Sequence, residues 1–218
     1  MSIPEFIGSL KSLTYLDLSN MNFVGRVPPQ LGNLTKLAYI DIHTDFFYAF
    51  LSDVSWLASL HSLQHLDMSG VNLSAAVGWV HALNKLPNLR ALYLSNCRLS
   101  SSIPSLRHHN LTVLEKLDLS GNPFNSLAAP NWYWDVTSLK ILDIDECELL
   151  GPFPDELGNL TMLETLHMEW NDIKGMIPAT LKNLCRLQAV YLAENIIGGD
   201  VTDLIERLPT VHGIACKS

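Results

Sequence analysis

The side chains best suited to chemistry lie in two adjacent stretches of the last third of the sequence, spaced 24 residues apart. They supply carboxylates, an imidazole and an indole: Asp143, Asp145, Glu146, His167, Glu169 and Trp170. An exposed indole beside acidic groups can dock a basic peptide through charge and an aromatic or proline contact. The alternative is a solvated acidic face on which Trp170 folds over a neighbouring segment.

The same spacing extends this set in both directions along the chain. Further candidates at matching positions are Tyr93, Asp118, Tyr191 and Glu194. Several of the aspartates belong to a recurring Leu-Asp-Leu-Ser motif. A repeat consensus explains those aspartates without any binding role, so both explanations stay open.

Catalytic chemistry finds little support in these residues. Acid/base catalysis needs one carboxyl group that is desolvated and unlike its partner, whereas these carboxylates fall at regular intervals. The pair His108-His109 has no cysteine or carboxylate nearby at the spacing of metal ligands. No glycine loop that could cradle a phosphate is present. The sequence therefore predicts a protein that is not an enzyme and has no cofactor or metal.

One eleven-residue pattern, LxxLxLxxNxL with tolerated exchanges, positions these side chains. It occurs eight times at intervals of 24 to 26 residues. The copies begin at Leu13, Leu37, Leu63, Leu89, Leu114, Leu139, Leu163 and Leu187. Self-similarity at this period is the signature of a leucine-rich-repeat solenoid, in which each coil buries its apolar face against its neighbours.

The pattern predicts an α/β solenoid of about eight full repeats, wound as a right-handed superhelix. Within each copy, leucines alternate with polar residues at the period of a strand, so parallel strands should form the concave face. A second signature, LxGxIP, follows at residues 23–28, 149–154 and 173–178. Its glycine permits a tight turn and its proline ends a short strand, so we expect 3₁₀ or helical turns on the convex face.

The ninth position of the pattern should hold the turn that leaves the sheet. The amides of Asn122, Asn171 and Asn195 can bond backbone groups there. Cys97 and Cys147 occupy the same position two coils apart, about 10 Å, which is too far for a disulfide. We therefore expect both to be buried free thiols. Cys185 and Cys216 are also expected to be free.

Charge and hydropathy exclude some partners. The net charge of −8 argues against nucleic acid, and no run of about 18 apolar residues could span a membrane. Four Asn-x-Ser/Thr sequons favour the secretory pathway and are candidate N-glycosylation sites: Asn33, Asn72, Asn110 and Asn159.

The LxGxIP signature resembles that of the plant-specific class of extracellular leucine-rich repeats. Two longer connectors rich in tryptophan, within residues 56–100 and from residue 108 onward, make the chain similar to plant receptor-like proteins of the fungal-xylanase-receptor and disease-resistance type. A full protein of that type also has a signal peptide, a cysteine-bearing cap, more repeats and a membrane span, which this sequence lacks. We therefore expect an internal piece of a longer solenoid.

The expected organisation is one leucine-rich-repeat domain over residues 1–218. Residues 1–12 align with the rear half of a repeat, residues 13–209 hold eight repeats, and residues 210–218 form a divergent tail or the start of a ninth strand.

The resemblance implies part of the ligand-sensing ectodomain of a cell-surface receptor at the plasma membrane, active in defence or development. Its partners would be a peptide or protein ligand and a co-receptor kinase. Two alternatives stay open: a secreted binding protein like the polygalacturonase inhibitors, and a truncated gene product without independent function.

Overall fold

Parallel strands, one from each repeat, form the main sheet of this computed structural model, which describes residues 2–45, 48–100, 110–125 and 132–199. The eight strands are β1 (Tyr15–Asp17), β3 (Tyr39–Asp41), β5 (His65–Asp67), β6 (Ala91–Tyr93), β7 (Lys116–Asp118), β8 (Ile141–Asp143), β10 (Thr165–His167) and β12 (Ala189–Tyr191). They are ordered as in the sequence and pair without any shift in register. The predicted parallel sheet is confirmed.

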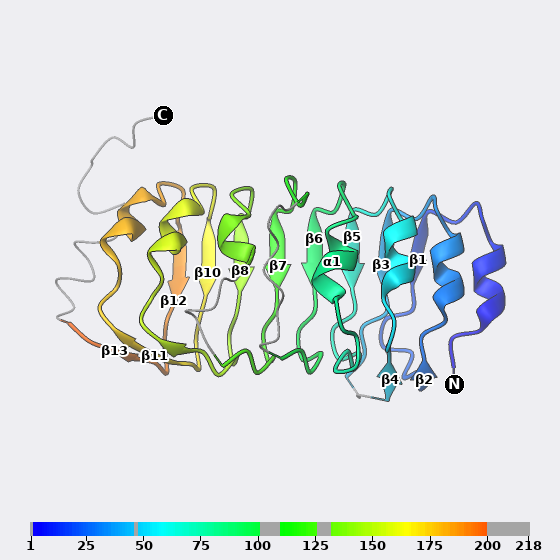
Figure 1. Cartoon of the computed structure of the whole chain (residues 1–218), viewed down its shortest axis with the longest axis horizontal. Helices are drawn as coiled ribbons and strands as arrows, with labels where there is room; N and C mark the ends of the chain where they lie inside the picture. Colours follow the sequence, from blue (N-terminus) through cyan, green and yellow to red (C-terminus); the bar gives the residue numbers. More distant parts are fainter. Residues whose placement is uncertain (1, 46–47, 101–109, 126–131, 200–218) are drawn as a thin grey trace.

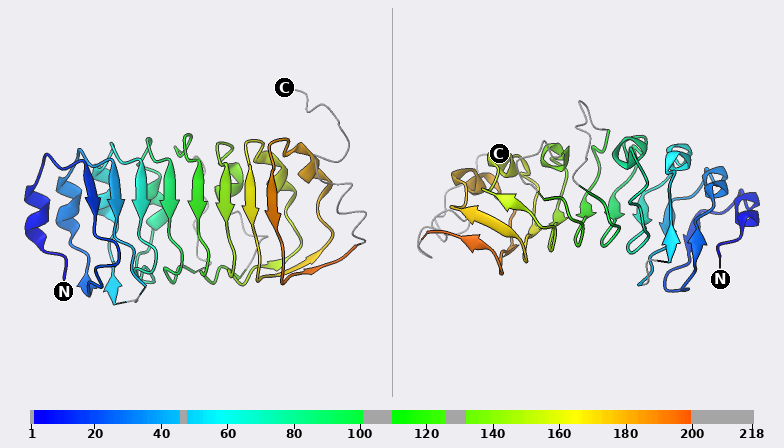
Figure 2. Two further views of the ribbon diagram at one scale, coloured as in Figure 1. Left: turned by 180° about the vertical axis from the view of Figure 1, so that it is seen from behind. Right: turned by 60° about the horizontal axis from the view of Figure 1, so that its bottom comes forward.

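Short helices cover the opposite side of the solenoid (Figures 1 and 2). They are the 3₁₀-helices η1 (Glu5–Ser9), η2 (Pro29–Asn33), η3 (Ser55–Ser59), η4 (Trp132–Asp135), η5 (Asp155–Asn159) and η6 (Ala179–Asn183), and the α-helix α1 (Trp79–Leu83). Figure 2 shows the coils stacked side by side from the blue N-terminal part to the orange C-terminal part, with the sheet on one face. None of the helices in the described ranges is long and apolar enough to cross a membrane.

A second row of very short strands lies along one edge of the solenoid, at the bottom of Figure 1. It comprises β2 (Gly25–Arg26), β4 (Ala49–Phe50), β9 (Leu150–Gly151), β11 (Asp172–Gly175) and β13 (Ile196–Ile197). The LxGxIP glycines supply its turns, since Gly25, Gly151 and Gly175 have φ of 89°, 105° and 91°. The prolines that end the signature immediately precede η2, η5 and η6.

The core is a column of leucines that runs through all the coils. The inward residues of the central strands, such as Leu66, Leu92 and Leu142, are fully buried. The tryptophan-rich connectors enlarge this core on the helical side, where the rings of Trp79 and Trp132 meet edge to face at 6.3 Å. Leucine burial therefore links each coil to its neighbours, as the repeat predicts.

The ninth-position asparagines join successive coils through buried hydrogen bonds. Asn122 Oδ1 accepts the backbone N–H groups of Cys97 (3.0 Å) and Leu99 (2.9 Å) in the preceding coil. Its Nδ2 donates to the carbonyl oxygens of Leu94 and Leu119, both at 2.8 Å. Asn171 and Asn195 repeat this arrangement two and three coils later in the ladder. The predicted role of these amides is confirmed.

At the same position, cysteine replaces the donor role of the asparagine amide nitrogen. The Cys97 thiol donates to the carbonyl of Met68 at 3.2 Å, and the Cys147 thiol donates to that of Leu119 at 3.3 Å. The N–H two residues after the ladder position of the preceding coil, which an asparagine oxygen accepts elsewhere in the ladder, is bonded by the main chain of these two coils. The backbone carbonyl of Cys97 instead accepts the N–H of Leu73, and that of Cys147 accepts the N–H of Phe124. The ladder therefore continues through both kinds of coil.

The predictions for the cysteines are partly wrong. Cys97 and Cys147 are free and buried, as expected. Cys185, expected to be free, is disulfide-bonded. It is an exposed residue just after η6, so the spacing of the buried ladder does not constrain it. Several predictions concern positions outside the described residues: His108-His109, Cys216 and the tail 210–218.

We predict that Asn122→Ala lowers the free energy of unfolding by about 2–5 kcal/mol, because it leaves buried donors and acceptors of two coils without partners. Asn88→Ala is the matched control. It also removes an amide bond between coils, from Asn88 Nδ2 to the His61 carbonyl at 2.8 Å, but in an exposed position. We expect it to cost less than about 1 kcal/mol. Equal losses in chemical denaturation of the two variants would contradict the ladder's importance.

Candidate ligand-binding surface

Three rows of side chains project from the concave sheet, because the strands pair in register. The first row reads Tyr15, Tyr39, His65, Ala91, Lys116, Ile141, Thr165, Ala189. The second row reads Asp17, Asp41, Asp67, Tyr93, Asp118, Asp143, His167, Tyr191. The third row, just beyond the strands, reads Ser19, His43, Ser69, Ser95, Ser120, Asp145, Glu169, Ala193.

Aspartates of the second row have a structural task. In each of five coils, Oδ1 of the aspartate accepts the backbone N–H of the residue two positions later, at 2.9–3.1 Å. The donors follow Asp17, Asp41, Asp67, Asp118 and Asp143. This hydrogen bond stabilises the turn at the end of each strand. The recurring Leu-Asp-Leu-Ser motif is therefore explained by folding, without a ligand. Tyr93, His167 and Tyr191 cannot make this bond and are departures from the rule.

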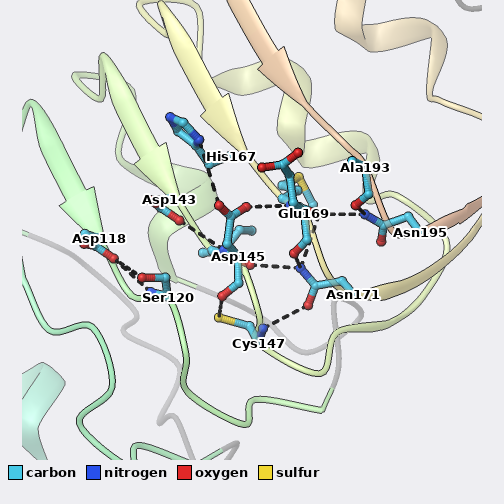
Figure 3. Close-up of polar contacts among 12 residues, drawn as sticks. Asp118, Ser120, Asp143, Asp145, Cys147, His167, Glu169, Asn171, Ala193 and Asn195 are labelled. Carbon is cyan, nitrogen blue, oxygen red and sulfur yellow. Dashed lines mark hydrogen bonds and ion pairs between the residues drawn. The ribbon is translucent and has the colours of Figure 1, made fainter. Parts of the chain in front are cut away.

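The C-terminal carboxylates and His167 come together at the ends of β8 and β10 (Figure 3). Asp145 Oδ2 lies 3.9 Å from His167 Nδ1, and Asp145 Oδ1 accepts the backbone N–H of Glu169. Burial raises the pKa of Asp143 to about 6, helped by the charges of Asp118 and Asp145. Burial also raises the pKa of Asp145. The surface thus holds negative charge that is only partly solvated.

His167 also makes an aromatic contact with Tyr191 of the next strand, β12. Its ring stacks on that of Tyr191 with centroids 4.4 Å apart and planes 5° from parallel. Tyr191 is 44 % exposed, so the pair presents a flat edge to solvent beside the carboxylates.

Glu146, Trp170 and Glu194 occupy the eighth position of three successive repeats, with φ of 52°, 54° and 57°. Left-handed backbone is costly for such side chains. Other coils place residues that adopt it readily at this position: Asn20, Gly70, Asn96 and Gly121. Trp170 is 61 % exposed and so does not fold over a neighbouring coil. The structure therefore places the C-terminal candidates on three adjacent coils.

Sequence reasoning missed a second group at the N-terminal end of the sheet. Tyr15 stacks on Tyr39 at 4.2 Å, Tyr39 stacks on His65 at 4.1 Å, and His65 meets Tyr93 at 5.4 Å. The signal was available, since the first row reads Tyr, Tyr and His in three consecutive copies of the repeat. His43 also departs from the usual serine, and its Nδ1 lies 2.8 Å from Asp41 Oδ1.

Two clusters bring three possible metal-ligand atoms within 4.8 Å of one another. One is Asp41, His43 and Asp67, and the other is Asp143, Asp145 and His167. Exposed acidic groups at such spacing are common without a metal. In the first cluster the histidine already pairs with Asp41, and in the second Asp145 holds a backbone N–H. Both clusters therefore place negative charge beside stacked aromatic rings.

The four sequons lie away from the three rows. Asn33 and Asn159 are exposed at the ends of η2 and η5, on the helical side. Asn110 is exposed, and its N–H and Nδ2 bond to Asn84. Asn72 is half-buried, and its Oδ1 accepts the N–H of Ser74 at 3.0 Å.

Comparison with known proteins agrees with this architecture. The family described as Leucine Rich Repeat matches residues 12–34, 138–160 and 162–184, and Leucine Rich repeats (2 copies) matches residues 87–131. Together these matches cover just over half of the chain. Among solved structures, PEPR1-AtPEP1 superposes with a TM-score of 0.77 at 29% identity, covering 91% of this chain and 27% of that one. The Arabidopsis receptor kinase HAESA, in complex with the peptide hormone IDA and the co-receptor SERK1, gives 0.75 at 25% identity, covering 90% and 32%.

Curated relatives place the chain more narrowly. It is 38% identical over 162 residues to Receptor-like protein EIX1 of Solanum lycopersicum, covering 72% of this chain and 15% of that protein. It is 31% identical over 159 residues to Receptor-like protein 39 of Arabidopsis thaliana, covering 73% and 17%. The chain thus spans less than a fifth of the length of either relative, and both are receptor-like proteins rather than enzymes. The chain therefore belongs to the leucine-rich-repeat family and is a homologue of plant receptor-like proteins, corresponding to part of a non-catalytic leucine-rich-repeat ectodomain.

Proposed function

We propose that this chain binds a peptide or protein ligand on its concave face, as part of the extracellular, ligand-sensing region of a plant receptor-like protein in defence or development. The observation that carries this proposal is the eighth-position series Glu146, Trp170 and Glu194. These residues hold a backbone conformation that glycine or asparagine adopts at lower cost, and Trp170 gains little burial in return. A ligand that contacts them would account for their presence.

Charge and shape support the same proposal. The acidic groups lie on the same three coils as the exposed indole and the stacked pair His167–Tyr191: Asp143, Asp145, Glu146, Glu169 and Glu194. A basic segment with an aromatic or proline residue complements this surface. Because the coils hold these side chains in fixed rows, binding would cost little ordering entropy. We treat residues 1–218 as one leucine-rich-repeat domain and propose that a co-receptor kinase supplies the signalling.

The four sequons support an extracellular location. We predict that secretory expression attaches N-glycans at Asn33, Asn110 and Asn159, where the asparagine and the following threonine are exposed. We expect the lowest occupancy at Asn72, which is half-buried and bonded to its own turn. Mass spectrometry before and after glycosidase treatment measures this. An unglycosylated secreted chain, or full occupancy at Asn72 alone, would contradict the prediction.

Charge reversal tests the binding surface. Peptides from a displayed random library are selected on the purified chain and measured against variants. We expect Glu146→Lys/Glu169→Lys to weaken the selected basic peptides at least about ten-fold, since two attractive charges become repulsive.

The matched control for that experiment is Asp155→Lys/Glu156→Lys in η5 on the helical side, where both residues are exposed. It changes the net charge equally and should alter affinity less than about two-fold, because distant exposed charges are screened. Equal weakening by the two variants would show that only overall charge matters, and the proposed surface would be rejected.

The raised pKa of Asp143 predicts a pH dependence with opposite signs for binding and stability. Asp143 ordinarily titrates near 3.8 and here near 6, so the folded chain binds the proton more tightly than the unfolded chain. The contribution of this group to stability therefore rises as pH falls from about 6 towards 3.8, while its attraction for a basic peptide is lost.

We expect the affinity advantage of the wild type over Asp143→Asn to be largest near pH 7 and to vanish by about pH 5. Titrations of a selected peptide across this range measure it. An advantage that persists undiminished at pH 5 would show that Asp143 does not act through its charge.

A further inference from the structure

A polar hollow of about 450 Å³ lies on the concave face over the central strands of the sheet, on the N-terminal side of the C-terminal cluster. Strands β5, β6 and β7 contribute Asp67, Tyr93 and Asp118 to its wall, and the turn after β3 contributes Asp45. Its described lining residues include three carboxylates and one histidine, His43, but neither a lysine nor an arginine. The hollow therefore favours a cation.

Tyr93 interrupts the row of aspartates in the middle of this hollow. Register places it directly between Asp67 and Asp118, one strand spacing of about 4.8 Å from each. An aspartate at this position would accept the N–H of Ser95, just as Asp67 and Asp118 accept the N–H groups two residues after them. Tyrosine gives up that bond and supplies a ring instead, tilted by 42° against the ring of His65.

The two flanking carboxylates are held in place and keep acceptor capacity. Asp67 Oδ1 accepts the N–H of Ser69 at 2.9 Å. Asp118 Oδ1 accepts both the N–H (2.9 Å) and the hydroxyl (2.7 Å) of Ser120, as Figure 3 shows.

The second oxygen of each aspartate is left for a ligand. Asp67 Oδ2 lies 3.9 Å from His43 Nδ1, so the two form an ion pair only when His43 is protonated. Asp118 Oδ2 has no partner within the described part of the chain. Burial raises the pKa of Asp67, and the charge of Asp41 also raises it.

Guanidinium fits this combination better than ammonium does. It is planar, stacks on aromatic faces, is weakly hydrated and presents paired donors that match a carboxylate. An ammonium group can satisfy the charge but not the stacking. We propose that the hollow at Tyr93 is a subsite for an arginine side chain of the ligand, whose guanidinium stacks on Tyr93 and pairs with Asp67 or Asp118. This inference rests on the proposed function, since it assigns part of the ligand bound by the concave face.

The test uses the whole chain and two small probes, N-acetyl-arginine amide and N-acetyl-lysine amide, titrated while the tyrosine ring signals are followed by NMR. We expect the arginine probe to shift the Tyr93 signals and to bind at least about five-fold more tightly than the lysine probe. Tyr93→Phe should keep this preference, because the ring remains. Tyr93→Leu should abolish the preference, and Asp118→Asn should weaken the arginine probe about five-fold.

Tyr48→Leu is the control, since it removes an exposed tyrosine that does not line the hollow, and it should leave the arginine probe unaffected. Equal binding of the two probes, or an arginine affinity unchanged in Tyr93→Leu, would overturn the subsite.

The outcomes separate this inference from the proposed function. Library peptides that bind the C-terminal cluster while the arginine probe fails would overturn the subsite and leave the proposed function intact. An arginine probe that binds at Tyr93, with no library peptide selected on the concave face, would keep the subsite and remove the wider proposal.

Discussion

Everything in this structure depends on how each coil satisfies the backbone groups of its neighbour. A coil of 24 to 26 residues is too small to bury its own polar main chain, so N–H and C=O groups at the turn must be paired by the next coil. Asparagine does this with a side-chain oxygen, whereas cysteine coils use a main-chain carbonyl. In both cases the same N–H, two residues after the turn position, is satisfied. The coils therefore stay in register although the ladder residue changes.

That constraint divides the concave residues into two kinds. Aspartates such as Asp17 and Asp67 hold the backbone of their own turn, so their recurrence reflects folding. Tyr93, His167 and Tyr191 lie in the same row but have no carboxylate to accept the backbone N–H of the turn. At the eighth position, glycine and asparagine serve the turn at little cost, whereas Trp170 and the neighbouring glutamates do so at a cost. Concave residues that do not stabilise the turn can differ between proteins without loss of the fold, so they are the ones that can determine which ligand binds.

Periodicity made most of the fold predictable. Leucine spacing located all eight strands, and the chemistry of the amide predicted the bonds of Asn122 and its equivalents. Predictions based on the regular pattern did not extend to residues off the ladder. Cys185 lies on the exposed outer turn, where the coil spacing sets no limit on disulfide formation. The exposure of Trp170 depends on a backbone angle, which composition alone does not reveal. The stack of Tyr15, Tyr39 and His65 is not predicted by the repeat, because the LxxLxLxxNxL pattern leaves this position unspecified.

The two acidic and aromatic regions of the concave face are close enough for one ligand to reach both. Register places Tyr93 and His167 three strand spacings apart, about 14 Å, which an extended chain covers in about four residues. Between them the first row carries Lys116, and the ion pairs Arg90–Glu115 and Glu115–Lys140 lie at 2.7 and 2.9 Å near the start of the strands. Positive charge in the first row of the middle strands therefore stands beside Asp118 and Asp143 of the second row. A segment with basic residues about four positions apart matches this alternation, whereas a uniformly basic segment would meet repulsion at Lys116. Spacing of charge, which the rigid coils fix, would then select the ligand as much as total charge does.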